Sequence, residues 1–295
     1  MTTSDHAAAA RGASIPVITS VQSIAQASRA WIVDIWGVIH NGARLFPDAV
    51  AACKAFRAAG GIVVLVTNAP RPTAAIEQQL ETMGVPDGTY DAIVTSGDVT
   101  RGLIRNHVGQ PIYHLGPERD VSVFDGIDVR FANAEDAVAV VNTGLFDDIT
   151  ETPDDYAAML AGFHARNLPM ICANPDITVE RGDDLVYCAG ALAQAYQAMG
   201  GVVAYAGKPH PPIYEAAFAH MDTVARASVP RDQIVCIGDG LRTDMKGAAT
   251  MGLRAVFVPS GVDMGKGGQA TQAEIDAAFA DGAFKPEAAQ FGLRW

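Results

Sequence analysis

Asp34 and Asp239 are the residues whose type and position most clearly allow chemistry. Each follows an apolar run, residues 31–33 in the first case and 233–238 in the second. Such runs are typical of buried parallel strands, and the carboxyl ends of parallel strands meet at one edge of a sheet, where open α/β sheets bind ligands. An Asp at a strand end can also simply cap a turn. If both carboxylates share a crevice, they repel each other unless a divalent cation bridges them, so the pattern predicts a metal site.

Four further residues offer groups that phosphoryl chemistry uses. Asp244 follows Asp239 by five residues, where it can orient the metal ligands or bind through water. Thr67 offers a hydroxyl and Asn68 a backbone N–H after the apolar run 62–66, both suited to a phosphoryl oxygen. Lys208 offers a positive charge. Each pattern alone is typical of a turn or loop, but together, in this order at strand ends, they predict a phosphate and metal site.

The elements that must position these residues follow from the apolar pattern. Helices are predicted from Pro47 to Gly60 and from Pro72 to Met83, a short lead-in helix over 15–30, and a frayed segment over 1–14. Three strand–helix units in a row favour a doubly wound parallel sheet. Core strands are predicted over six mostly apolar segments: 31–34, 62–66, 91–95, 202–206, 233–238 and 254–258.

The middle of the chain has a different pattern of apolar and polar residues. Its apolar runs are shorter and its loops richer in Asp and Asn, which favours an inserted second α/β domain over a continuation of the same sheet. We therefore predict a first core part over residues 1–97, an insertion over 98–203 and a second core part over 204–295. The elements expected in the insertion are strands over 112–116, 137–142 and 170–173 and helices over 153–166 and 190–199.

Composition limits the classes of partner. The chain has 295 residues, is 49% hydrophobic and carries a formal charge of −12. That size allows a large core and two domains, and the charge disfavours binding to nucleic acid or anionic lipid. No run approaches about 18 strongly apolar residues, so we expect no membrane span and a cytoplasmic protein. The four cysteines, each within an apolar run, are expected to be buried reduced thiols: Cys53, Cys172, Cys188 and Cys236.

Motifs spread over nearly the whole chain from about residue 15 resemble the haloacid dehalogenase superfamily, specifically its class IIA, the NagD-like phosphatase branch. The resemblance implies a Rossmann-like parallel sheet core with an inserted α/β cap domain, here residues 98–203. The motifs that carry it are Asp34-Ile-Trp-Gly-Val, Val66-Thr67-Asn68, Thr95-Ser96, Cys172-Ala-Asn174-Pro175-Asp176, Ala189-Gly190-Ala191, Gly207-Lys208-Pro209-His-Pro, Ile237-Gly238-Asp239-Gly-Leu-Arg-Thr-Asp244 and Ser260-Gly261-Val262.

The resemblance also implies roles for single residues. Asp34 would be the nucleophile that becomes an aspartyl phosphate, and Thr67, Asn68 and Lys208 would hold the phosphoryl group. In the cap, Asn174 and Asp176 are candidates for substrate contacts. The ligands implied for Mg²⁺ are Asp34, the backbone carbonyl of Trp36 and Asp239, with Asp244 in support.

Trp36 is the one departure from the family pattern, which has a second Asp two residues after the nucleophile as general acid and base. The backbone carbonyl survives this change, but the proton shuttle does not. General acid–base catalysis contributes roughly 10²- to 10⁴-fold in rate, or about 3–5 kcal/mol of barrier. His40, His210 and Asp176 are candidate replacements, with surface or packing roles as the alternative for each.

The expected function is that of a Mg²⁺-dependent phosphatase or phosphotransferase. Its substrate would be a small phosphorylated metabolite and its intermediate an aspartyl phosphate. The alternative is a catalytically impaired protein that binds a phosphorylated ligand or has a regulatory role, which Trp36 favours and the retained Asp34 disfavours. No nucleic acid or membrane partner is expected, and a homodimer is left open.

Overall fold

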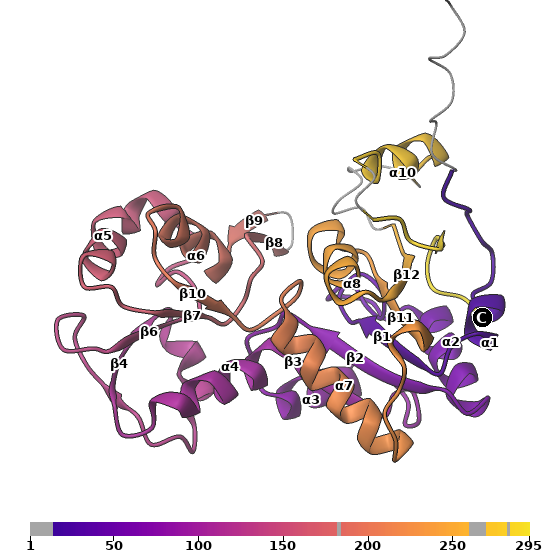
Figure 1. Ribbon diagram of the computed structural model, residues 1–295, viewed down its shortest axis with the longest axis horizontal. Helices are drawn as coiled ribbons and strands as arrows, with labels where there is room; N and C mark the ends of the chain where they lie inside the picture. The colour runs from indigo at the N-terminus through magenta and orange to yellow at the C-terminus, as the bar shows by residue number, and fades with distance from the viewer. Residues whose placement is uncertain (1–13, 182–183, 260–269, 282–283) are drawn as a thin grey trace, which may run out of the picture.

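Two parallel sheets dominate the computed structural model, which describes residues 14–181, 184–259, 270–281 and 284–295. The six-stranded sheet has the order β13-β12-β11-β1-β2-β3 and the five-stranded sheet the order β10-β7-β6-β4-β5. Figure 1 shows them in separate halves of the molecule, and a two-stranded antiparallel pair, β8 and β9, lies on the side of the smaller sheet that faces the larger one. The Ser260-Gly261-Val262 motif and all but the last residue of the segment 1–14, predicted to be frayed, lie outside the described residues.

The central strand of the larger sheet is β1 (Ala30–Asp34), between β11 (Ile234–Gly238) and β2 (Ile62–Thr67). All three are buried along their length, and every pairing in the sheet is parallel. This confirms the α/β class and the Rossmann-like core predicted from the apolar runs. The outer strands are β3 (Ala92–Thr95), β12 (Arg254–Phe257) and β13 (Ala288–Ala289).

Helices cover both faces of this sheet. Alternate side chains of each strand point to opposite faces, so Trp31 packs in one core cluster and Ile32 in the other. On the first face Trp31 stacks on Phe56, with ring centroids 3.9 Å apart. The helices of that face are α2 (Pro47–Ala58) and α3 (Thr73–Thr82), and those of the other are α7 (Pro211–Ala225) and α8 (Lys246–Met251) (Figure 1).

The smaller sheet lies between two parts of the larger one in the sequence. Helices α5 (Ala157–Ala165) and α6 (Ala189–Ala198) pack in one of its clusters, and α4 (Ser96–Ile104) contributes Ile104 to the other. The segment between β7 and α6 carries the β8–β9 pair. The strands are β4 (Pro111–Leu115), β5 (Arg130–Phe131), β6 (Ala139–Asn142), β7 (Met170–Cys172), β8 (Thr178–Arg181), β9 (Asp184–Tyr187) and β10 (Val203–Tyr205).

Two expectations about the elements are wrong. The run 202–206 was expected in the core sheet, but β10 pairs with β7 in the smaller sheet. A lead-in helix was expected over 15–30, but α1 spans only Gln22–Gln26. The backbone near Ile18 is instead extended beside β13, because it hydrogen-bonds to Ala289. The predicted domain limits at 98 and 203 fall inside α4 and β10.

Short helices make up most of the remaining elements, and sequence analysis assigned few of them. Among the cysteines, all free, Cys53, Cys172 and Cys236 are buried as expected, whereas Cys188 is half-buried. None of the described helices is long and apolar enough to cross a membrane. The short elements are η1 (Arg105–His107), η2 (Glu118–Phe124), η3 (Pro153–Tyr156), η4 (Arg231–Gln233), the π-helical turn η5 (Leu241–Met245) and α10 (Gln272–Ala278).

Candidate active site

Three carboxylates converge at the carboxyl edge of the larger sheet. Asp34 is the last residue of β1, and Asp239 directly follows the neighbouring strand β11, so parallel pairing brings both to the same edge. Asp244 joins them from the η5 turn. One oxygen from each of the three lies within 4.8 Å of the others, and the residues are only 7%, 7% and 1% exposed. The structure therefore brings together the carboxylates that the sequence analysis selected as metal ligands.

Gly37 lets the chain pass close to this cluster. Its φ of +87° is in the left-handed region, and a Cβ at this position would lie 2.0 Å from Asp239 Oδ2. Both constraints favour glycine, because other residues rarely adopt this conformation and none would leave room for the carboxylate. The loop after Asp34 can therefore close against Asp239 only with a glycine here.

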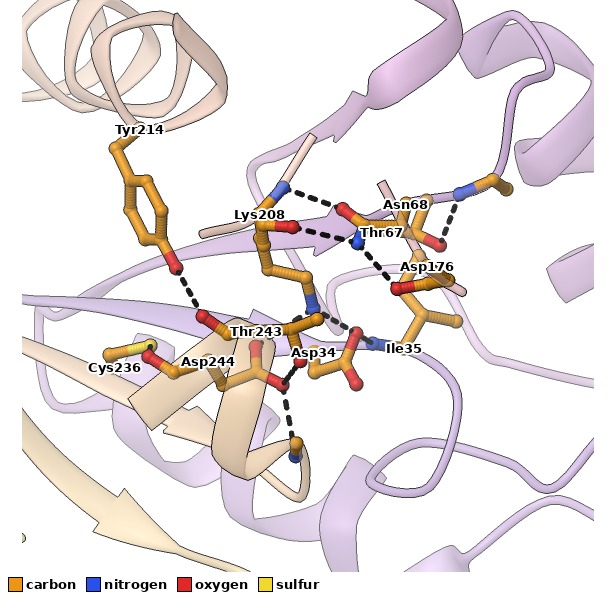
Figure 2. A network of polar contacts seen from close by, with 12 residues as sticks. Asp34, Ile35, Thr67, Asn68, Asp176, Lys208, Tyr214, Cys236, Thr243 and Asp244 are labelled. Carbon is orange, nitrogen blue, oxygen red and sulfur yellow. Dashed lines mark hydrogen bonds and ion pairs between the residues drawn. The ribbon is translucent and has the colours of Figure 1, made fainter. Parts of the chain in front are cut away.

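Lys208 is the buried counterion of the cluster. It is 2% exposed, and its Nζ lies 2.6 Å from Asp34 Oδ1 and 2.8 Å from Asp244 Oδ1 (Figure 2). Burial lowers the pKa of Lys208, but Asp244 and Asp34 raise it by more, so the pKa lies above its ordinary value. Burial and Asp244 raise the pKa of Asp34 well above its ordinary value, against the opposing effect of Lys208. Two of the three carboxylates, Asp34 and Asp244, thus share one ammonium.

The donor set of this cluster fits a hard divalent cation. Carboxylate oxygens are the ligands that Mg²⁺ and Ca²⁺ prefer, and the three carboxylates outnumber the Lys208 ammonium, which contacts two of them. The residues available to hold the ion are Asp34, Asp239 and Asp244, with the backbone carbonyl of Trp36 two residues along the chain. The buried cluster alone is thus consistent with the Mg²⁺ site predicted from the sequence, without distinguishing Mg²⁺ from Ca²⁺.

The predicted phosphate-binding pair lies at the end of β2. The Thr67 hydroxyl accepts a hydrogen bond from the backbone N–H of Ala69 at 3.2 Å. Asn68 was selected for its backbone N–H, but its side chain also contacts the site: Asn68 Oδ1 accepts from the N–H of Lys208 at 2.7 Å. Asn68 Nδ2 donates to Asp176 Oδ1 at 2.9 Å (Figure 2). Nothing in the sequence pattern indicated this side-chain network.

The two cap candidates lie in the loop after β7. Asn174 is 8% exposed, and its Oδ1 accepts from the backbone N–H of Asp176 at 3.0 Å. Since Asp176 also bonds to Asn68, this loop of the smaller sheet reaches the edge of the larger one.

Trp36 and the two candidate histidines make contacts of their own. The half-buried Trp36 directs its indole Nε1 toward Gly42, where a Cβ would lie 3.4 Å away. His40 Nδ1 accepts from the backbone N–H of Gly42 at 2.9 Å, so the ring is neutral with its proton on Nε2, and burial lowers its pKa. His210 stacks on Tyr205 with ring centroids 4.2 Å apart, and burial followed by Lys246 lowers its pKa. These contacts agree with packing roles for both histidines.

A cavity of about 390 Å³ lies between the loop after β2 and the smaller sheet. Its wall includes Asn174, Arg71 from the loop after β2 and Asp120 from η2. Burial raises the pKa of Asp120, against the nearby Arg119. The sequence analysis missed Arg71 and Asp120, although Arg71 could have been found from its place four residues after Thr67. The other residues lining the cavity are Pro70, Pro72, Ala75, Arg119, Ser122, Thr143, Gly144, Leu145, Asp148, Val179, Tyr187 and Cys188.

Comparison with known proteins identifies the family. A model described as haloacid dehalogenase-like hydrolase matches residues 31–130, and a second model of haloacid dehalogenase-like hydrolases matches residues 205–282. The crystal structure of a hydrolase of the haloacid dehalogenase-like family from Brucella suis 1330 is 46% identical, covers 83% of this chain and 94% of that one, and superposes with a TM-score of 0.78. The chain belongs to the haloacid dehalogenase-like hydrolases. The resemblance noted from the motifs and the prediction of an enzyme are both confirmed.

Two further relatives of this haloacid dehalogenase-like hydrolase carry phosphatase names. Ribonucleotide monophosphatase NagD of Escherichia coli K12 is 28% identical over 237 residues, which are 78% of this chain and 87% of that protein. The p-nitrophenyl phosphatase from Archaeoglobus fulgidus is 19% identical, with a TM-score of 0.70 over 90% of this chain and 96% of that one. At that identity the second likeness speaks for the fold alone.

Proposed function

We propose that this hydrolase is a Mg²⁺-dependent phosphatase that acts on a small phosphorylated metabolite through an aspartyl phosphate at Asp34. The observation that carries the proposal is the position of Lys208, whose buried Nζ contacts Asp34 and Asp244 in the carboxylate cluster. A buried ammonium at this position reduces the repulsion between an anionic phosphoryl group and the Asp34 carboxylate. The name of the NagD relative, a ribonucleotide monophosphatase, supports a phosphate monoester as substrate.

The chemistry assigned to this chain has two steps. An oxygen of Asp34 attacks phosphorus, and the bond from phosphorus to the leaving group breaks, with the electron pair and then a proton going to the leaving oxygen. Water then attacks phosphorus, which releases inorganic phosphate and restores the Asp34 carboxylate. Thr67 and the backbone of Asn68 orient the phosphoryl oxygens, and Lys208 balances their charge. When bound at the three carboxylates, Mg²⁺ supplies further positive charge against the phosphate.

The smaller sheet is assigned the role of a cap. We infer that the insertion over residues 98–203 covers the Asp34 site and that the cavity walled by Arg71 and Asn174 receives the leaving group. The contact between Asp176 and Asn68 supports this assignment, because it joins the loop after β7 to the phosphate-binding edge. The cytoplasmic location and the homodimer stay predictions.

A protein that binds a phosphorylated ligand without turnover is the second candidate. Trp36 favours it, because an indole has no group that gains or loses a proton near neutral pH and so cannot act as general acid or base. Lys208 disfavours it, since binding alone needs no buried contact between an ammonium and the Asp34 carboxylate.

Turnover of a panel of phosphate monoesters, with Mg²⁺ and with a chelator, tests the proposal. We expect Mg²⁺-dependent release of inorganic phosphate, a phosphoryl group on Asp34 after rapid quenching, and loss of both in Asp34→Asn. Asp87→Asn, at an exposed position, is the matched control and should behave as wild type. Phosphate binding without turnover would establish the second candidate instead. Absence of both binding and turnover would rule out the phosphate site.

A further inference from the structure

We propose that Asn68 is a positioning residue that links the position of the insertion to the position of Lys208. The inference rests on the proposed function and adds a link between two parts of its site. One side-chain amide joins the backbone of Lys208, in the core, to the carboxylate of Asp176, in the insertion (Figure 2).

The amide of Asn68 holds both backbone groups of Lys208. Asn68 Oδ1 accepts from the Lys208 N–H at 2.7 Å, and Asn68 Nδ2 donates to the Lys208 carbonyl at 3.1 Å. These two partners fix the orientation of the amide, since an exchange of oxygen and nitrogen would break both bonds. The Lys208 backbone is therefore held by a side chain 140 residues away in the sequence.

The second proton of Asn68 Nδ2 extends this contact to the insertion. It is donated to Asp176 Oδ1 at 2.9 Å, so both N–H groups of the amide have partners. The N–H of Asp176 donates to Asn174 Oδ1, which orders the loop that delivers the carboxylate. If the insertion moved away, Asn68 would lose one of its three hydrogen bonds, and its hold on Lys208 would weaken.

Gly207, directly before Lys208 in the chain, packs against both the core and the insertion. A Cβ at this position would lie 2.4 Å from Asn68 Oδ1 and 2.6 Å from Pro175 Cδ. The core amide and the loop after β7 therefore approach the same backbone from two sides. A shift of that loop reaches the Lys208 backbone both by direct contact and through Asn68.

The consequence concerns the leaving group. Asn174 lies in the wall of the 390 Å³ cavity and also orders Asp176, so a leaving group that fills the cavity contacts the loop that supports Asn68. Part of its binding energy then places Lys208 Nζ against Asp34. Binding energy used in this way raises kcat rather than only lowering KM.

The first test compares three variants of the full chain, assayed with Mg²⁺ and p-nitrophenyl phosphate. Asn68→Ala keeps the backbone N–H that faces phosphate but removes the amide, and we expect kcat to fall by roughly 10- to 100-fold, as for a small misplacement of a reacting group. The kcat of Asp176→Ala should fall by less than that of Asn68→Ala. Asn68→Ala with Asp176→Ala should be no worse than Asn68→Ala alone, because both act through one contact. Multiplied losses in the double variant would overturn the coupling.

Asp176→Asn separates positioning from acid catalysis. An Asn can still accept from Asn68 Nδ2 through its own oxygen, so positioning predicts kcat within a few-fold of wild type and an unchanged pH profile. A loss as large as that of Asp176→Ala, with an altered profile, would make Asp176 the general acid and overturn the proposal. Asp87→Asn is the control, since it changes a carboxylate at an exposed position outside both the insertion and the Lys208 loop. Its kcat should stay at the wild-type value.

Hydrogen exchange keeps this test separate from that of the phosphatase activity. In the Mg²⁺-loaded protein without substrate, Asp176→Ala should speed exchange at the Lys208 amide, and Asp87→Asn should not. Equal exchange in wild type and Asp176→Ala would refute the coupling even if every variant is a phosphatase. If exchange is faster in Asp176→Ala but the wild type hydrolyses no phosphate ester, the phosphatase proposal is refuted and the coupling stands.

Discussion

Lys208 Nζ lies 2.6 Å from Asp34 Oδ1, in a site where the lysine is 2% exposed. The same ammonium is 2.8 Å from Asp244, and Asp239 completes the carboxylate cluster. Burial strengthens the attraction to the lysine and also the repulsion among the carboxylates, because water screens neither. A site with this charge balance should bind a cation and gain stability from it.

The first prediction is that Mg²⁺ stabilises the protein through this cluster. A ligand that binds only the native state at 100 times its Kd adds about 2.7 kcal/mol, which for a chain of this length raises Tm by roughly 4–5 °C. Asp239→Asn should abolish most of this rise. It should not lower Tm without metal, because it removes a repelling charge. Calorimetry at low salt, with Asp87→Asn as control, measures both effects, and a wild-type Tm indifferent to millimolar Mg²⁺ would contradict the site.

Gly37→Ala should disrupt the cluster without altering any carboxylate. The added Cβ would lie 2.0 Å from Asp239 Oδ2, so that carboxylate has to move, and the response to Mg²⁺ should be lost. Gly60→Ala is the matched control, since its φ of +90° is similar but no atom lies within 4 Å of the added Cβ. Both variants should lose about 1–2 kcal/mol from backbone strain, and only Gly37→Ala should lose activity. Equal Mg²⁺ responses would show that Asp239 tolerates the methyl group.

The pH dependence of stability should contain a contribution from His114. Burial lowers its pKa, and its Nε2 lies 2.9 Å from Thr143 Oγ1. Below about pH 6.5 the unfolded histidine is protonated while the native one is still neutral, so the native state binds fewer protons and stability falls as the pH falls through this window. His114→Gln should flatten the fall in unfolding free energy between pH 7 and pH 5. His220→Gln, on the exposed side of α7, should leave it unchanged, and identical slopes in all three proteins would refute the assignment.

The positions of the two strand-end aspartates were the most predictable part of the site. Apolar runs before Asp34 and Asp239 predict buried parallel strands, and the register of β1 and β11 then places both carboxylates at one edge. The contact of Asn68 with Lys208 was not predictable, because it joins loops 140 residues apart whose conformations no periodic pattern encodes. The same limit applies to β10, since a three-residue apolar strand fits either sheet and only its pairing with β7 decides. Backbone pairing with Ala289 likewise overrode the helical pattern predicted over residues 15–30.

The last prediction concerns Trp36, where the chain departs from the family pattern. If Asp34 attacks phosphorus but no group efficiently protonates the leaving oxygen, aryl phosphates should react much faster than alkyl phosphates, because a phenolate leaves without a proton. The measurement is kcat/KM for p-nitrophenyl phosphate and for glycerol phosphate, since kcat/KM reports the first phosphoryl transfer. A burst of p-nitrophenol should also appear, because hydrolysis of the phosphoenzyme lacks a base.

Trp36→Asp should then raise kcat/KM for glycerol phosphate by up to the roughly 10²- to 10⁴-fold expected of acid–base catalysis and shrink the burst. Trp36→Asn is the control, because it matches the new side chain in size but transfers no proton and should gain nothing. The indole is half-buried against Gly42, so its removal should cost less than the ~3–5 kcal/mol of a fully buried tryptophan. A fourth carboxylate adds repulsion to the cluster, so the gain should appear only with Mg²⁺ present. A wild type that already hydrolyses glycerol phosphate as fast as the aryl ester, with no burst, would show that another residue is the acid.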